Sequence, residues 1–328
     1  MKGAFKNLGK SGLKVSPVCL GTMTFDREAD QDESFRIMDY FVEQGFNFLD
    51  TANAYSLGKS EEVVGRWMKK RANRKSVIIA TKVYGKMGEG PNDSGLSRIH
   101  ILQAVEDSLR RLQTDVIDLY QIHRWDPTAP PEETLRALDD LVRQGKVRYI
   151  GCSNLKAWHL SLFLNLADTR LLSRFVCLQP IYNALSRGIE LELLPLCKVE
   201  GIGVISYNPL AGGVLTGKYK RGDELAEGSR LQAFDTYYQR YYTDQTFDIV
   251  EAFVAHAKQR GVTPAQLALA WVMAEERVTC PILGTRNLEQ LKDSLQGAEI
   301  ELSEEERKAV PAMRPGYWVG KDPVYDRE

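Results

Sequence analysis

Eight short apolar runs, separated by longer amphipathic stretches, constrain the fold of this 328-residue chain more than any other feature. The runs are rich in β-branched residues, and most do not alternate apolar with polar side chains. That pattern is typical of strands buried on both faces, as in a parallel sheet. We expect strands at residues 18–20, 46–50, 77–82, 116–123, 147–152, 175–179, 203–207 and 280–283.

The stretches between these runs carry helix signals. One begins at Ser97, a residue type that caps helix N-termini, and another follows Pro130 and Pro131 and ends before Gly145. Alternating strands and helices imply right-handed crossovers and a parallel sheet, and eight such units favour a closed (β/α)8 TIM barrel of the α/β class. We expect this barrel to form a single domain over residues 1–328, with helices at 32–44, 60–71, 97–112, 132–144, 156–166, 189–199, 264–275 and 288–295.

Three segments break the alternation. Residues 8–15 predict an N-terminal β-hairpin that could plug the bottom of the barrel. Residues 219–245 are polar, aromatic and aperiodic, and so long a loop in a compact domain is usually a functional lid or a disordered segment. Beyond residue 302 we expect one extra C-terminal helix and then a tail, residues 315–328, that contains Trp318.

Bulk composition excludes several classes of function. The 43 Lys and Arg residues nearly balance 44 Asp and Glu, and a net charge of −1 gives no reason to expect nucleic acid or an anionic membrane as a partner. No apolar run could span a bilayer, and the N-terminus lacks a signal-peptide pattern. The five cysteines are scattered and odd in number, which suits a reducing cytoplasm, and no CxxC or paired-His spacing predicts a metal site.

Polar residues collect at the ends of neighbouring predicted strands. Asp50 ends the second strand, Lys82 the third and His123 the fourth. Tyr55 follows in the loop after the second strand. Each residue alone has an ordinary explanation, such as a turn carboxylate, a solvated ammonium or a core imidazole. Because catalytic groups of β/α barrels project from the carboxyl ends of strands, their coincidence predicts one site, in which Asp50 would partner the charge of Lys82.

These four residues suggest carbonyl reduction. Reducing a ketone or an aldehyde requires hydride at the carbon and a proton at the oxygen. A free phenol is a weak acid with a pKa of about 10, and a nearby ammonium such as Lys82 lowers that pKa by favouring the phenolate. Tyr55 would therefore donate the proton, and His123 would orient or polarise the carbonyl group.

Several motifs resemble those of the aldo-keto reductase family. The resemblance rests on the strand that ends at Lys82 and on the segments DTANAY at 50–55, GKSEE at 58–62, DLYQIH at 118–123 and GKVRYIGCSN at 145–154. It covers nearly the whole chain and is greatest to bacterial reductases related to the potassium-channel β-subunit branch. The resemblance implies a TIM barrel and reduction by a nicotinamide cofactor. Ser56 departs from the pattern, since many members have Gly after the catalytic Tyr.

The cofactor needs a site other than a Rossmann motif, because no GxGxxG joins a first strand to a helix. Loops after the seventh and eighth strands of a barrel suit phosphates, and residues 281–287 supply a strand end, Gly284 and then a helix. Arg286 could hold a 2′-phosphate by charge-assisted hydrogen bonds, which favours NADP(H) over NAD.

The resemblance also implies further contacts with the cofactor. Ser153, Asn154 and Gln179 would bind the nicotinamide carboxamide, and Tyr207 would stack on the ring. Turn chemistry is the alternative explanation for the polar loop residues. The other implied contacts are Gly21, Thr22, Met23 and Asp50 at the reactive centre, Asn208, Pro209, Leu210, Ala211, Gly212 and Lys218 at the pyrophosphate, and Arg230, Gln290, Asp293 and Ser294 near the adenosine end.

Other functions are less consistent with the sequence. Residues 212–218 match the GxxxxGK of a nucleotide-triphosphate loop, but Tyr219 stands where that loop needs Ser or Thr for Mg²⁺. A hydrolase or lyase would need paired carboxylates or a metal cluster, and the strand ends supply only Asp50. A cofactor-sensing binding subunit, by analogy with channel β-subunits, would transfer hydride slowly, and no docking segment is evident.

The substrate would be a small-molecule carbonyl compound. Residues near Met23, Arg124 and Trp125, the 219–245 segment and the tail near Trp318 would select it. Trp125 and the tyrosines of the 219–245 segment predict a partly aromatic pocket, although these side chains could equally pack the segment onto the barrel.

Overall fold

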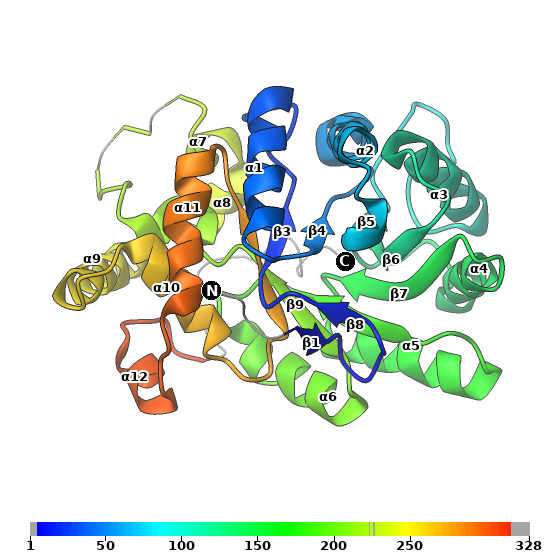
Figure 1. The fold of residues 1–328 in the computed structure, drawn as a ribbon. Helices are drawn as coiled ribbons and strands as arrows, with labels where there is room; N and C mark the ends of the chain where they lie inside the picture. Colours follow the sequence, from blue (N-terminus) through cyan, green and yellow to red (C-terminus); the bar gives the residue numbers. More distant parts are fainter. Residues whose placement is uncertain (1–4, 223, 226, 316–328) are drawn as a thin grey trace.

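A computed structural model describes residues 5–222, 224–225 and 227–315. Eight parallel strands close into one barrel, in the order β3 to β9 and back through β10, and helices surround it (Figure 1). This confirms the predicted (β/α)8 barrel, and each strand begins and ends within two residues of its expected position. The strands are β3 Cys19–Gly21, β4 Phe48–Asp50, β5 Ile78–Val83, β6 Ile117–Ile122, β7 Val147–Ser153, β8 Phe175–Gln179, β9 Gly203–Tyr207 and β10 Cys280–Gly284.

The outer helices follow the predicted positions with two exceptions. The helix expected to end at residue 166 continues to Arg170. The helix expected from residue 189 begins only at Leu193, so that Pro195 falls in the first turn, where its missing N–H breaks no helical hydrogen bond. The helices around the barrel are α1 Gln31–Glu43, α2 Lys59–Arg71, α3 Arg98–Leu112, α4 Pro131–Arg143, α5 Ala157–Arg170, α6 Leu193–Glu200, α10 Pro264–Met273 and α11 Leu288–Gln296, and the expected C-terminal helix is α12 Glu304–Ala309.

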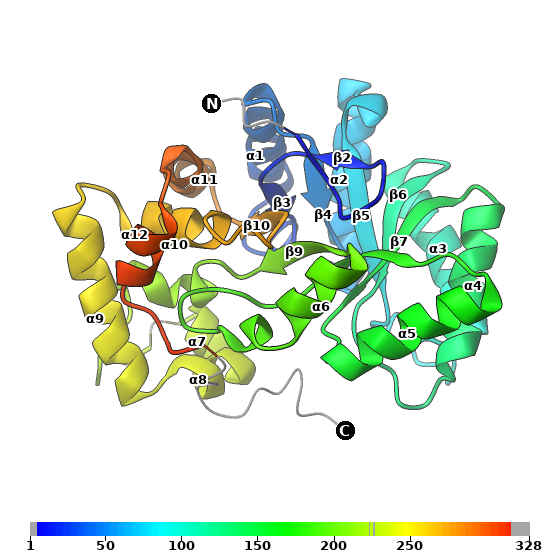
Figure 2. The same cartoon turned by 90° about the horizontal axis from the view of Figure 1, so that it is seen from below.

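The N-terminal hairpin is present as strands β1 Lys6–Asn7 and β2 Lys14–Val15, which pair antiparallel. Its residues Leu8, Leu13 and Val15 are buried in the barrel-interior cluster together with residues of β3, β4 and β9. The hairpin, dark blue in Figure 2, therefore lies against the amino-terminal ends of the strands and fills the bottom of the barrel with apolar side chains.

The segment 219–245 is more regular than its sequence predicts. It contains α7 Arg230–Ala233 and α8 Asp235–Tyr241, and α9 Asp244–Gln259, which lies outside the predicted set, begins within it. Pairs of tyrosines four residues apart lie on the same side of the helix, a pattern that the polar residues around them obscure in the sequence. Tyr238 stacks on Tyr242 with ring centroids 4.7 Å apart, and Tyr237 lies 6.2 Å from Tyr241.

Two expectations concern the ends of the chain and the membrane. Trp318 and the tail around it lie outside the described residues, so a single domain over residues 1–328 stays a prediction. Of the helices in the described part of the chain, none is long and apolar enough to cross a membrane.

Gly9 tests the packing of the hairpin. Its φ is +59°, and a Cβ there would lie 2.4 Å from the carbonyl oxygen of Gly201. We expect Gly9→Ala to lower the free energy of unfolding by about 2–5 kcal/mol, the sum of left-handed strain and backbone overlap. Gly145→Ala is the matched control, since Gly145 has a φ of +74° and no atom within 4 Å, and should cost only about 1–2 kcal/mol. Equal losses in urea denaturation would contradict tight hairpin packing.

Candidate active site

A buried ion pair lies at the carboxyl-terminal edge of the barrel. Asp50 ends β4, and Lys82 lies one residue before the end of β5 on the neighbouring strand. Their side chains are 3% and 0% exposed, and the Lys82 ammonium donates to Asp50 Oδ1 and, over 2.8 Å, to the carbonyl oxygen of Thr51. Burial lowers the pKa of Lys82, but Asp50 and Tyr55 together raise that pKa above its ordinary value. Lys82 therefore stays protonated inside the protein.

The second oxygen of Asp50 accepts two amide hydrogen bonds. Gln121 Nε2 on β6 lies 3.1 Å from Oδ2, and Gln179 Nε2 on β8 lies 2.9 Å from it. Gln179 was expected at the nicotinamide carboxamide, whereas Gln121 is absent from the predicted site. The sequence signal for Gln121 is a polar side chain within a strand that is buried along its whole length. With these amides, all the polar atoms of the ion pair that face the interior have partners.

Tyr55 and His123 complete the cluster. Lys82 Nζ lies 3.3 Å from the Tyr55 hydroxyl and 4.9 Å from the centre of its ring. The rings of Tyr55 and His123 meet edge to face with centroids 5.9 Å apart. The structure thus brings together the four residues that the sequence placed on adjacent strand ends.

Burial sets the protonation states of these two side chains. Burial raises the pKa of Tyr55, and although Lys82 acts in the opposite direction, the pKa stays above its ordinary value. Lys82 acts on the pKa of Tyr55 in the expected direction, but desolvation of a phenolate outweighs the attraction of the ammonium. Burial, with Lys82 and Arg124, lowers the pKa of His123 to about 3. At neutral pH the site holds a neutral phenol and a neutral imidazole.

The turn that carries Tyr55 is held in an unusual backbone conformation. The 3-10 turn Tyr55–Gly58 places Ser56 at a φ of +49°, the left-handed region that glycine occupies most easily. A Gly at position 56 would adopt this conformation without strain. The Ser56 hydroxyl donates to the carbonyl oxygen of Phe25 over 3.2 Å and so supports the turn.

A second buried ion pair supports the same turn from below. Glu61, fully buried on α2, accepts from Arg111 Nε over 2.7 Å and from the hydroxyl of Thr81 over 2.6 Å. Arg111 also packs against Gly58 so closely that a Cβ there would lie 2.7 Å from its side chain. The GKSEE segment therefore fixes the Tyr55 turn to the strand that carries Lys82.

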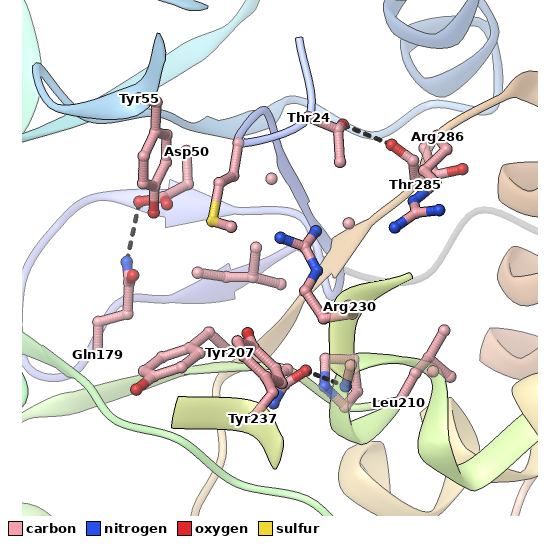
Figure 3. A pocket seen from close by; sticks show the side chains of 18 of the residues that line it. Thr24, Asp50, Tyr55, Gln179, Tyr207, Leu210, Arg230, Tyr237, Thr285 and Arg286 are labelled. Atoms are coloured by element: carbon pink, nitrogen blue, oxygen red, sulfur yellow. Dashed lines mark hydrogen bonds between the residues drawn. The ribbon is translucent and has the colours of Figure 1, made fainter. Parts of the chain in front are cut away.

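A cavity of about 640 Å³ opens beside the cluster. Figure 3 shows Tyr55 and Asp50 at one end, Arg286 and Thr285 at the other, and Arg230 between them. The predicted site residues that line it are Gly21, Met23, Asp50, Tyr55, His123, Ser153, Asn154, Gln179, Tyr207, Asn208, Pro209, Leu210, Gly212, Lys218, Arg230, Gly284, Arg286, Gln290, Asp293 and Ser294.

Three predicted residues stand behind the cavity wall. Lys82 lies beneath Tyr55, as described above. The Thr22 hydroxyl is buried, donates to the backbone carbonyl of Asp50 over 3.2 Å and lies 2.8 Å from the Ser60 hydroxyl. Ala211 is fully buried in the core. In this structure Thr22 and Ala211 shape the wall from behind.

The residues expected to select the substrate are partly in the cavity wall. Arg124 lines the cavity, and so do Tyr237 and Arg240 of α8, which belong to the 219–245 segment. Tyr84, which follows β5, also lines the cavity and was not predicted. Trp125, expected in the pocket, is not among the lining residues but stacks on His159 with centroids 4.1 Å apart.

The half of the cavity away from Tyr55 has features that fit the phosphate groups of a dinucleotide. Gly212 and Gly213, in the turn after β9, have φ angles of +69° and +88°, which glycine adopts without strain, and a Cβ at Gly213 would lie 2.9 Å from the Lys218 side chain. Arg230 Nη1 is buried and has no hydrogen-bond partner among the described residues. Lys218 and Arg286 add two more cations to the same wall. Among the described residues no cluster of three or more His, Cys, Asp or Glu could hold a metal ion.

Fold and site together define a (β/α)8-barrel protein whose polar cluster sits at the carboxyl ends of the strands. The sequence matches the family model described as the Aldo/keto reductase family over residues 17–314. The chain therefore belongs to the aldo/keto reductase family of oxidoreductases.

Curated proteins give the same assignment. The chain is 40% identical to a Bacillus subtilis (strain 168) protein named uncharacterized oxidoreductase YrpG, over 94% of this chain and 95% of that one. It is 35% identical to aldo-keto reductase AFTS1 of Alternaria alternata, over 94% and 90%. It is 36% identical to an Arabidopsis thaliana protein named probable voltage-gated potassium channel subunit beta, over 90% and 91%.

Arg111 tests the support beneath the turn. Arg111→Met leaves the carboxylate of Glu61 buried without its cation, and we expect a loss of about 3–5 kcal/mol in the free energy of unfolding, measured by urea denaturation. The double variant Arg111→Met, Glu61→Gln should recover part of that loss, since no buried charge remains. Arg136→Met, which removes the exposed pair with Glu132, is the control and should cost less than about 1 kcal/mol. Similar costs at both arginines would contradict the assigned role.

Proposed function

We propose that this protein reduces small-molecule aldehydes or ketones to alcohols with NADPH, and that Tyr55 donates the proton to the carbonyl oxygen. The observation that carries the proposal is the Tyr55 hydroxyl, which lies 3.3 Å from the Lys82 ammonium at the wall of the cavity. The raised pKa of Tyr55 keeps this hydroxyl protonated until a carbonyl oxygen gains negative charge.

Lys82 and Asp50 support the transfer of that proton. The bound nicotinamide cofactor supplies the hydride to the carbonyl carbon. As the proton leaves Tyr55, the adjacent and fully buried ammonium of Lys82 stabilises the phenolate. Asp50 holds that ammonium in place, and the amides of Gln121 and Gln179 hold Asp50.

His123 orients the carbonyl group. Its pKa of about 3 keeps the imidazole neutral, so one ring nitrogen donates a hydrogen bond without adding a second positive charge beside Lys82. A hydrogen bond from His123 and the proton from Tyr55 would meet at the same carbonyl oxygen, because the two rings are in contact.

The cationic half of the cavity would hold the cofactor. Arg286 would bind a 2′-phosphate, which favours NADP over NAD, and Lys218 and Arg230 would face the other phosphates. Ser153, Asn154 and Gln179 would hold the carboxamide, although here the Tyr207 hydroxyl donates to Asn154 Oδ1 over 2.9 Å and Gln179 to Asp50. We place the protein in the cytoplasm, a proposal that its five free and buried cysteines support.

Tyr55→Phe tests the proton donor. We expect kcat for neutral aldehydes to fall by about 10²–10⁴-fold, because a positioned acid contributes on that order, while the affinity for NADPH measured by fluorescence is retained. Tyr120→Phe is the matched control: the Tyr120 hydroxyl is buried, outside the cavity lining, and has no hydrogen-bond partner among the described residues. Unchanged turnover in Tyr55→Phe would refute the proposed role.

Arg286→Met tests the choice of cofactor. Turnover of an aldehyde, ketone and quinone panel with NADPH and NADH side by side should favour NADPH in the unaltered protein. In the variant we expect the dissociation constant for NADPH to rise about tenfold or more, with that for NADH changed less than about threefold, since only NADPH has the 2′-phosphate. A parallel loss for both cofactors would assign Arg286 a different role.

A second candidate is a cofactor-sensing subunit, favoured by the likeness to the protein named as a potassium channel subunit. Such a subunit would turn over slowly and bind a membrane partner. A steady-state rate measured beside a pull-down from membrane fractions separates the two functions: fast turnover without a partner supports the reductase.

A further inference from the structure

Arg124 lies on the proton-donor side of the cavity. It follows His123 directly, after β6, and both residues line the cavity. The guanidinium acts on the imidazole, since it contributes to the lowered pKa of His123. Arg124 thus stands beside the place where a carbonyl group would be reduced.

The guanidinium of Arg124 has a ring beneath it but no anion. Its central carbon lies 4.6 Å from the centroid of the Tyr84 ring. Within the described part of the chain, Arg124 makes no ion pair and donates no hydrogen bond, so its N–H donors are available to a ligand. Two other cations at this cavity do have carboxylates: Lys82 pairs with Asp50, and Arg230 lies 3.6 Å from Glu28.

Tyr84 holds this guanidinium in position. Tyr84 comes two residues after Lys82, at a φ of +152°, a conformation that side-chain-bearing residues rarely adopt. Its carbonyl oxygen accepts from the backbone N–H of Gly95 over 2.9 Å, which keeps the chain in this conformation. A cation over an aromatic ring is stabilised without using an N–H donor, so the contact fixes Arg124 and leaves its hydrogen-bonding capacity unused.

The phosphates of the proposed cofactor have cations of their own. Lys218, Arg230 and Arg286 come after β9, from α7 and after β10, and Figure 3 shows Arg230 and Arg286 away from Tyr55. Arg124 instead follows β6, directly after His123. An anion at Arg124 would therefore belong to the substrate.

We propose that the preferred carbonyl substrates carry an anionic oxygen group, a carboxylate or a phosphate, and that Arg124 binds it. This inference rests on the proposed reductase function. The planar fork of a guanidinium matches both anions through paired, charge-assisted hydrogen bonds, and in a half-buried site such bonds contribute more than at a surface. Arg124 is then a specificity-determining residue, and the Tyr84 ring positions it.

The experiment compares substrates that differ only in charge. With NADPH, kcat/KM is measured for para-carboxybenzaldehyde against methyl para-formylbenzoate, and for glycolaldehyde phosphate against glycolaldehyde. We expect the unaltered protein to prefer the anion at least about tenfold in one pair, and which pair shows it identifies the anion. In Arg124→Met that preference falls to about twofold or less, whereas turnover of the neutral partner changes less than about threefold. Arg124→Lys retains part of the preference.

Controls separate charge from folding and from the reaction itself. Arg148→Met removes a cation that pairs with Asp118 outside the cavity lining and should keep the preference. If Arg124→Met does not fold, Arg124→Gln replaces it. If the neutral substrates are turned over in a Tyr55-dependent reaction and neither anion is preferred, this inference alone is overturned. A preference for the anion that survives in Arg124→Met overturns it as well. Absence of turnover with all four aldehydes counts against the proposed function instead.

Discussion

The buried ion pair between Lys82 and Asp50 is the interaction on which the rest of the site depends. Two charges held out of water are costly unless each finds partners, so the surrounding strands supply the Thr51 carbonyl and the amides of Gln121 and Gln179. Those partners come from β4, β6 and β8, which face one another only because the barrel is closed. The closed fold therefore makes a protonated lysine beneath Tyr55 possible.

The two ends of the barrel differ in the polarity of their side chains. At the amino-terminal end, Leu8, Leu13 and Val15 of the hairpin seal the interior with apolar contacts. At the carboxyl-terminal end the interior is polar, and the pair between Glu61 and Arg111 ties the helices outside to the turn that presents Tyr55. Apolar packing thus closes one end of the barrel, and polar groups for chemistry collect at the other.

The barrel and the strand-end cluster could be predicted because buried parallel strands appear as continuous apolar runs and their ends as isolated polar residues. Gln121 was missed because its partner, Asp50, lies on another strand and no local pattern joins them. The 219–245 segment was expected at the pocket, but the helix α8 that places Tyr237 and Arg240 there was not predicted, because the composition of the segment is polar. The effect of Lys82 on the pKa of Tyr55 could be predicted, but the larger opposite effect of burial could not, because spacing reveals a neighbouring charge and not the depth of burial.

The positions of the five cysteines affect how the protein reacts with electrophiles. All are buried, and burial raises the pKa of each thiol. A protonated, inaccessible thiol is a poor nucleophile, so it resists alkylation and oxidation. Aldehydes and quinones are electrophiles that modify reactive cysteines. If the protein acts on such compounds as proposed, its buried thiols would protect it from inactivation through its sulfur atoms.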